Sequence, residues 1–202
     1  MVGSMLPAKV ILVDREGPLV AAWREAFRDV PEVEAVRGDF FANDAEAMVS
    51  PANSFGVMDG GLDLAIRDVL GLEVERRIRE RIASRHHGEL PVGVAEIVET
   101  DDARWPLLVC APTMRVPEDA SRTLNAYLAF RAVLLELSRL GEERGRAVSS
   151  VVCPGMCTGV GAMSPRRCAA QMRVAWRQMN GPSTTPPFSE IHRVHQALRN
   201  AD

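Results

Sequence analysis

The sequence predicts a layered α/β domain built on a mainly parallel sheet. Short apolar runs alternate along the chain with longer segments whose apolar residues recur at helical spacing. This alternation is typical of strands joined by crossover helices. A length of 202 residues suits one domain with a substantial core. Apolar residues make up 47% of the chain and charged residues 25%, which argues against extensive disorder.

Six short apolar runs are predicted to be strands. The first, at residues 9–14, has the continuous apolar character of a strand that is buried on both faces. Turn-forming residues punctuate several of the others, including a proline on either side of residues 107–111. The six runs are residues 9–14, 33–40, 47–53, 92–99, 107–111 and 148–153.

Five segments carry apolar residues at helical spacing and are predicted to be helices. In residues 62–82 the apolar residues fall at every fourth position, and we expect Gly71 to break or kink this helix. The helix of residues 123–140 is expected to end at Gly141, and the helix after Ser164 begins with a hydroxyl N-cap followed by proline. The other two helices are expected within residues 18–30 and within residues 191–198.

The domain is expected to cover residues 9–181. Residues 1–8 are interpreted as an N-terminal extension that is partly a cloning remnant, and residues 182–202 as a proline-rich linker with a short helix. No apolar run approaches the roughly 18 residues of a membrane-spanning helix, and the first residues lack the pattern of a signal peptide. We therefore expect a cytoplasmic protein without a membrane partner.

The charge balance argues against general nucleic-acid binding. The chain has 24 basic and 27 acidic residues and a net charge of −3, whereas binding to a nucleic-acid backbone needs clustered Lys and Arg. The four cysteines lie in or beside apolar segments and are interpreted as buried free thiols. Their spacing does not suit a zinc site, so we expect no metal and no required cofactor.

Two glycine-bearing loops, each between a predicted strand and a predicted helix, are the main functional signal. The first loop reads Asn-Ser-Phe-Gly-Val-Met-Asp-Gly-Gly-Leu-Asp at residues 53–63, and the second reads Pro-Gly-Met-Cys-Thr-Gly-Val-Gly at residues 154–161. Glycine lets backbone N–H groups approach an anion, and a helix N-terminus adds partial positive charge. Neither loop is a Walker or dinucleotide-binding motif. Each alone is explained by a tight turn, but together they predict a cleft that holds a pyrophosphate from both sides.

The loops belong to a longer pattern of motifs. In order, the chain carries Gly-Asp-Phe at 38–40, Ser-Pro-Ala-Asn-Ser at 50–54, Gly-Gly-Leu-Asp-Leu-Ala-Ile at 60–66, and the second loop. In order and spacing these motifs resemble the macrodomain family (ADP-ribose-binding, Appr-1''-p processing type), from about residue 33 to about residue 179. The resemblance implies a three-layer α/β/α sandwich with a mixed, mainly parallel central sheet. It also implies that the ligand is ADP-ribose or an ADP-ribosylated macromolecule.

The resemblance implies a role for each matching residue. Asp39 would accept a hydrogen bond from the adenine amino group, and the Phe40 backbone would complete adenine recognition. Asn53 would bind hydroxyls of the distal ribose, and in hydrolytic members the residue matching Asp63 helps to position or activate water at the anomeric carbon. The backbones that would contact the phosphates and the distal ribose are those of Gly60, Gly61, Leu62, Thr158, Gly159, Val160 and Gly161.

Each of these side chains also has a simpler explanation. Asp39 suits a turn at the end of a strand, and Asn53 suits the cap of the next turn. Asp63 stands in the first turn of a helix, where the helix dipole favours a carboxylate without any catalysis. Three functions therefore stay open: hydrolysis of ADP-ribosyl linkages, non-catalytic reading of ADP-ribosyl groups, and an α/β scaffold that binds no nucleotide.

The chain departs from the family at several positions. Asp59 replaces a common loop glycine, and its carboxylate would repel a pyrophosphate unless it points to solvent. Ala162 and Met163 stand where the family often has an aromatic residue against the distal ribose, for which Phe55 is one substitute. No apolar strand follows the last long helix. The sheet is expected either to lack that strand or to have the N-terminal strand at an edge.

Overall fold

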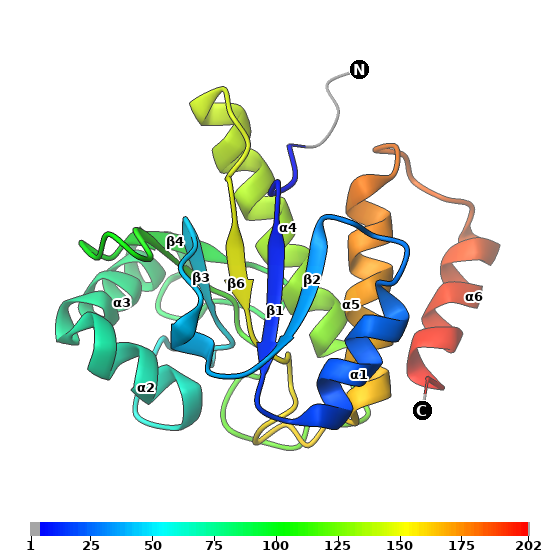
Figure 1. Ribbon diagram of the computed structural model, residues 1–202, viewed down its shortest axis with the longest axis horizontal. Coiled ribbons are helices and arrows are strands. Elements are labelled where there is room, and N and C mark those ends of the chain that lie inside the picture. Colours follow the sequence, from blue (N-terminus) through cyan, green and yellow to red (C-terminus); the bar gives the residue numbers. More distant parts are fainter. Residues whose placement is uncertain (1–4, 202) are drawn as a thin grey trace.

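A six-stranded sheet forms the middle layer of the protein (Figure 1). The structure, a computed structural model, describes residues 5–201. Its strands are β1 (Val10–Asp14), β2 (Val33–Arg37), β3 (Ala47–Ser50), β4 (Glu96–Glu99), β5 (Leu107–Cys110) and β6 (Val151–Cys153). Their order in the sheet is β2-β1-β6-β3-β5-β4. All neighbouring strands are parallel except β4 and β5, so the sheet is mixed and mainly parallel.

Helices cover both faces of the sheet, and the result is a three-layer α/β/α sandwich (Figure 1). One face carries α1 (Gly17–Ala26), α4 (Asn125–Arg144) and α5 (Pro165–Asn180), and the other carries α2 (Gly61–Leu70) and α3 (Leu72–His86). Successive residues of a strand point to opposite faces. Val10 and Leu12 of β1 therefore enter one apolar core, while Ile11 and Val13 enter the other.

The first strand lies inside the sheet. β1 pairs with β2 on one side and with β6 on the other, where Val10 is in register with Val151. No strand follows α5 among the described residues; a linker leads instead to α6 (Phe188–Arg199), which packs beside α5 (Figure 1). The sheet thus lacks a strand after the last long helix. The other expectation, an N-terminal strand at an edge, is wrong because β2 occupies that edge. Within residues 5–201, no helix is long and apolar enough to cross a bilayer.

Local backbone chemistry sets several element boundaries. β2 ends earlier than expected because the Asp39 side chain caps a short 3-10 helix, η1 (Phe40–Ala42). α4 continues past Gly141 and ends at Gly145, whose left-handed φ of 67° is a conformation that favours glycine. Gly71 separates α2 from α3, as expected, with a φ of 88°. The predicted N-cap of α5 is present, since the Ser164 side chain accepts a hydrogen bond from the first helical turn.

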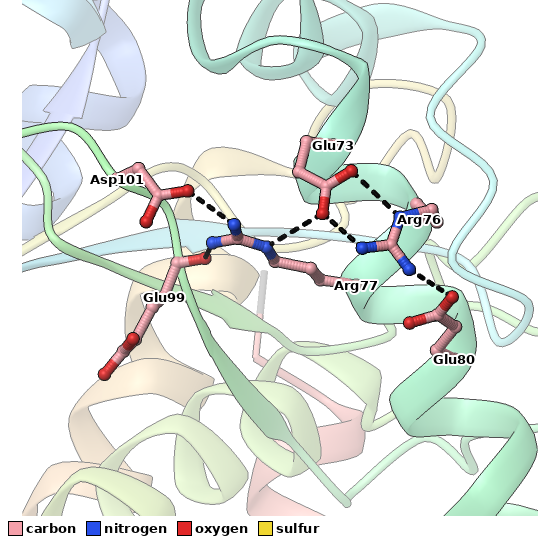
Figure 2. A network of polar contacts seen from close by, with 6 residues as sticks. All are labelled: Glu73, Arg76, Arg77, Glu80, Glu99 and Asp101. Carbon is pink, nitrogen blue, oxygen red and sulfur yellow. Dashed lines mark hydrogen bonds and ion pairs between the residues drawn. The ribbon is translucent and has the colours of Figure 1, made fainter.

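Arginine side chains cover the exposed edge of β4. Arg77 of α3 donates a hydrogen bond of 2.8 Å to the Glu99 carbonyl, and Arg81, one turn later, donates one of 3.1 Å to the Ile97 carbonyl. Figure 2 shows Arg77 between the Glu99 carbonyl and Asp101, within a wider set of acidic and basic partners on α3. An edge strand otherwise presents unpaired carbonyl groups to other chains. The arginines therefore block the addition of another strand at β4.

Candidate functional site

The two glycine-bearing loops meet at one cleft. The first loop (residues 53–63) follows β3 and enters α2, and the second loop (residues 154–161) follows β6. β3 and β6 are parallel neighbours, so both loops begin at the same end of the sheet, where the carboxyl ends of the strands lie. Gly60 of the first loop and Gly159 of the second both line a cleft of about 320 Å³. The structure thus brings the two loops together at the carboxyl ends of the strands.

The first loop ends in a helix N-terminus that has no side-chain cap. Gly60 is the N-cap residue of α2, and it provides no side-chain acceptor for the first turn. The N–H groups of Gly61, Leu62 and Asp63 have no acceptor within the helix. A Cβ added at Gly60 or Gly61 would meet no atom within 4 Å, so the cleft is open at both residues. These donors and the positive end of the helix dipole suit an anion.

The second loop presents further unpaired donors. The backbone N–H groups of residues 158–161 make no hydrogen bond with any residue that the structure describes. The loop is held instead through its carbonyl groups. Ala162 N donates to the Gly159 carbonyl and Ala120 N donates to the Gly161 carbonyl, each at 3.0 Å. The second loop is therefore fixed in place while its N–H groups stay available to a ligand.

The glycines of the second loop differ in what they do. A Cβ at Gly155 would lie 2.3 Å from Thr158 Oγ1, and a Cβ at Gly161 would lie 2.6 Å from the Cys157 carbonyl oxygen. Close packing requires glycine at both positions, which agrees with the tight-turn explanation. A Cβ at Gly159 would meet no atom within 4 Å. Gly159 therefore keeps space open in the cleft rather than serving the turn.

Asp63 lines the cleft from the first turn of α2. Its Oδ1 accepts a hydrogen bond of 2.5 Å from the buried Ser50 hydroxyl. Burial raises the pKa of Asp63 to about 6; the Ser50 hydrogen bond opposes the rise and the charge of Asp59 adds to it. Asp59 itself is exposed to solvent. Asp63 is therefore mostly ionised at pH 7 and can accept a proton close to neutral pH.

Asn53 lines the cleft and shapes the first loop. Its Oδ1 accepts hydrogen bonds from the N–H groups of Phe55 at 3.0 Å and Val57 at 3.3 Å, and its Nδ2 donates to the Val57 carbonyl at 2.7 Å. These bonds are the turn-capping role that the sequence allowed. A side-chain amide has two N–H groups, so one of them stays available for a ligand.

Asp39 and Phe40 are not among the described residues that line the cleft. Asp39 Oδ1 accepts from the Phe41 N–H at 2.9 Å, and Oδ2 pairs with Arg15 at 2.8 Å. The Phe41 bond first, and then Arg15, lower the pKa of Asp39. Phe40 is buried in the core. Asp14, the last residue of the neighbouring β1, does line the cleft. Asp39 therefore lies one strand beyond the cleft wall.

A further wall of the cleft was missed by the sequence argument. Thr113, Met114 and Pro117 follow β5, and with Asp14 they line the cleft. Met114 forms an isolated bridge with Asn53, which joins this wall to the first loop. Ligands of α/β sheets bind beyond the carboxyl ends of strands. That rule points to the residues after β1 and β5 as well, but the strand order, which places them beside the two loops, is needed to assign them to this cleft.

Phe55 does not supply the aromatic surface that it was expected to offer. It is not one of the described residues that line the cleft, and the Arg115 guanidinium lies over its ring at 5.1 Å from the centroid. Met114 and Pro117 give the cleft apolar surface instead.

Comparison with known proteins agrees with this geometry. The family model described as Macro domain matches residues 49–172, a range that contains both loops. A protein of Aquifex aeolicus is 32% identical over 143 residues, which make up 71% of this chain and 79% of the relative. A macro domain-containing protein of Streptomyces griseus is 33% identical over 132 residues, which make up 64% of this chain and 70% of the relative.

Solved structures share the fold. The macrodomain of Mycobacterium tuberculosis DarG matches with a TM-score of 0.58 and 21% identity, covering 72% of this chain and 90% of that one. A mutant of the Oceanobacillus iheyensis macrodomain with ADPR matches with a TM-score of 0.59 and 16% identity, covering 88% of this chain and 82% of that one. With the fold, the two loops and the family model in agreement, this chain belongs to the macro domain family.

Proposed function

We propose that the protein binds ADP-ribose or ADP-ribosyl groups in the cleft between the two loops. The observation that carries this proposal is the presence of unpaired backbone N–H groups on both sides of one cleft. A pyrophosphate carries negative oxygens on two phosphorus atoms, so it is best held by donors from two directions. Ligands seen in other macrodomains support the proposal: the Oceanobacillus iheyensis protein with ADPR and with ADP, and Thermosipho africanus DarTG with ADP-ribose.

In the proposed pose the ligand runs along the carboxyl ends of the strands. The first turn of α2 and residues 158–161 hold the pyrophosphate. The adenine extends past Asp14 toward Asp39 and the backbone of Phe40. The distal ribose lies against Asn53, which has one free amide N–H, and Asp63. An ADP-ribosylated macromolecule would present the same group, with its linkage atom at the end of the cleft nearest Asp63.

We further propose that the cleft hydrolyses ADP-ribosyl linkages, with Asp63, which lines it, as the group that accepts a proton. With a pKa of about 6, Asp63 is mostly ionised at pH 7 and can take a proton from water. The water oxygen would form a bond to the anomeric carbon of the distal ribose, and the bond from that carbon to the target would break. The target's linkage atom would leave with the electron pair and take the proton that Asp63 had removed from water, which returns Asp63 to its ionised form. Asn53 would hold the ribose during this step.

Calorimetry with ADP-ribose, ADP and NAD in parallel tests the binding proposal. We expect clear preference for ADP-ribose over ADP, because ADP lacks the distal ribose that a complete site would contact. NAD contains that ribose with nicotinamide on its anomeric carbon, so its affinity shows whether the site accepts a group at that carbon. A ligand that binds the folded state raises the melting temperature, so a thermal shift gives an independent measurement. An absence of heat and of any thermal shift, at ADP-ribose concentrations well above micromolar, would favour the scaffold function.

Incubation with ADP-ribosylated protein and ADP-ribosylated DNA distinguishes a hydrolase from a non-catalytic reader of the modification. We expect release of ADP-ribose from one of these substrates. In Asp63→Ala this release should be lost, whereas ADP-ribose should still bind through the phosphate and adenine contacts, with lower affinity than in the wild type. Tight binding without turnover on any substrate would favour the reader.

A further inference from the structure

Ser50 joins the sheet to the functional end of α2. It is the last residue of β3, its carbonyl accepts from the Ala111 N–H at 3.1 Å, and the residue is only 1% exposed. Its hydroxyl donates to Asp63 Oδ1 at 2.5 Å. The donor therefore comes from the rigid centre of the fold, and the acceptor comes from the helix turn that borders the cleft. The bond fixes the orientation of the Asp63 carboxyl group.

The second oxygen of Asp63 is free. Within residues 5–201, Oδ2 makes no hydrogen bond, and it is not one of the buried polar atoms that lack a partner. Solvent therefore reaches Oδ2. Since Asp63 lines the cleft, Oδ2 is the carboxyl oxygen that a bound ligand would meet.

We propose that Ser50 is a positioning residue, which holds Asp63 by one oxygen so that the other accepts a hydroxyl group of the ligand. This inference rests on the proposed function and adds a rule of specificity to it. A carboxylate oxygen accepts hydrogen bonds and repels anions. The site therefore favours a diphosphate that continues into a sugar with free hydroxyls, and it disfavours a nucleotide that ends in a further phosphate.

The role of Ser50 can be measured through the pH at which Asp63 ionises, which depends on the groups around it. Asp59 of the first loop disfavours the charged carboxylate, and the Cys110 thiol of β5, whose pKa is raised by burial, stays neutral. Asp14 lines the same cleft, and on α3 the Glu75 carboxylate is paired with Arg67 of α2. The Ser50 hydrogen bond favours the charged form of Asp63. Without that bond, Asp63 should ionise at a higher pH.

The experiment measures the affinities for ADP-ribose and for ADP by calorimetry between pH 5 and pH 8. In the wild type we expect the ADP-ribose affinity to change around one midpoint set by Asp63. The terminal phosphate of ADP ionises in the same range, so the ADP affinities of the variants are compared at pH 7 alone. In Ser50→Ala, the midpoint should move to higher pH and the ADP-ribose affinity at pH 7 should fall about tenfold, as expected when the ligand hydroxyl loses its hydrogen bond to a correctly oriented Asp63 carboxylate. The ADP affinity should not change. Ser50→Thr keeps the hydroxyl and should restore the midpoint.

Two further variants guard against a purely structural effect. Ser50→Cys keeps nearly the same volume with a weak donor, so it should behave like Ser50→Ala even if the alanine variant folds poorly. Ser149→Ala removes a comparable bond, of 2.9 Å to Glu46, at a site that does not line the cleft. It should leave both affinities and the midpoint unchanged.

The outcomes distinguish this inference from the proposed function. A wild-type midpoint and wild-type ADP-ribose affinity in both Ser50→Ala and Ser50→Cys would overturn the role of Ser50 while ADP-ribose binding stands. A Ser50→Thr variant that folds but keeps the midpoint of Ser50→Ala would also overturn it. Failure of the wild type to bind ADP-ribose would remove the proposed function itself.

Discussion

Arg15 donates a hydrogen bond of 2.8 Å to Asp39, and the two residues follow the ends of the neighbouring strands β1 and β2. The carboxylate proposed to accept from adenine is therefore already oriented by a cation, as well as by the Phe41 N–H. Each carboxylate oxygen can accept more than one hydrogen bond. The pairing with Arg15 thus orients the Asp39 carboxylate toward the proposed adenine position, and the carboxylate can still accept a further hydrogen bond from adenine.

Replacing Asp39 should weaken ADP-ribose binding strongly. Asp39→Ala removes the acceptor for the adenine amino group, and we expect calorimetry to show a loss of about tenfold or more, as for a hydrogen bond to a charged group. Asp44→Ala is the matched control, because Asp44 is also exposed and paired with an arginine, Arg104. Equal affinities of wild type and Asp39→Ala would place the adenine elsewhere.

A negative charge at Gly159 should abolish binding without affecting the fold. A side chain at this position enters open cleft space, so the melting temperature of Gly159→Glu should equal that of the wild type. Like charges brought together in a binding site cost several kcal/mol, and we expect a loss of at least about 100-fold in ADP-ribose affinity. Gly159→Gln has the same size and should lose less. If Gly159→Glu and Asp39→Ala both bind normally, the cleft is not the ligand site.

Glu46 should make the stability of the protein sensitive to acid. Hydrogen bonds from Arg146 and from Ser149 lower the pKa of Glu46 from 4.5 to about 2. Because the folded-state pKa is the lower one, Glu46 stabilises the fold above pH 4.5, and this contribution is lost as the pH falls toward 2. Glu46→Gln should cost about 2 kcal/mol at pH 7, as for hydrogen bonds to a charged group. Urea unfolding at pH 7 and pH 3 should show this difference shrinking in acid. Glu34→Gln, at an exposed pair with Lys9, should have little effect at either pH.

Removing the arginines that cover β4 should promote self-association. In the double variant Arg77→Ala and Arg81→Ala, the carbonyl groups of the β4 edge lose their donors and can pair with another strand. Sedimentation velocity should show a larger mean mass than for wild type at the same concentration. Arg76→Ala is the control, because within residues 5–201 the pairs of Arg76 are confined to Glu73 and Glu80 of its own helix (Figure 2). Association in the control as well would point to lost surface charge rather than to the strand edge.

Features that depend on short stretches of chain could be predicted from the sequence. Gly71 breaks a helical stripe and Ser164 caps a helix because neighbouring backbone groups decide both outcomes. The position of β1 inside the sheet could not be predicted, because strand order depends on pairing between distant segments. Gly141 was expected to end α4, but it lies buried within the helix, where an added Cβ would be 3.2 Å from Met5 Cβ; this packing against a distant residue could not be predicted either.

The candidate site also has parts that could be predicted from the sequence and parts that depend on the tertiary fold. The two loops could be predicted because glycines between a strand and a helix are a local signal with a physical meaning. Met114 and Pro117 carry no such signal, and they reach the cleft only because β5 lies next to β3. The Ser50–Asp63 bond joins residues that are 13 positions apart, on a strand and on the helix that follows it. It was missed because a buried serine at a strand end has many structural explanations.

The place of β1 also has a consequence for the synthesis of the chain. Of the six strands β1 is synthesised first, beginning at Val10, but its partner β6 begins only at Val151. Such distant pairing slows folding. Until β6 emerges, the apolar strand beginning at Val10 has one exposed side, which makes the nascent chain prone to aggregation. Molecular chaperones that bind nascent chains should therefore raise the yield of folded protein, with little effect on the stability of the protein once it has folded.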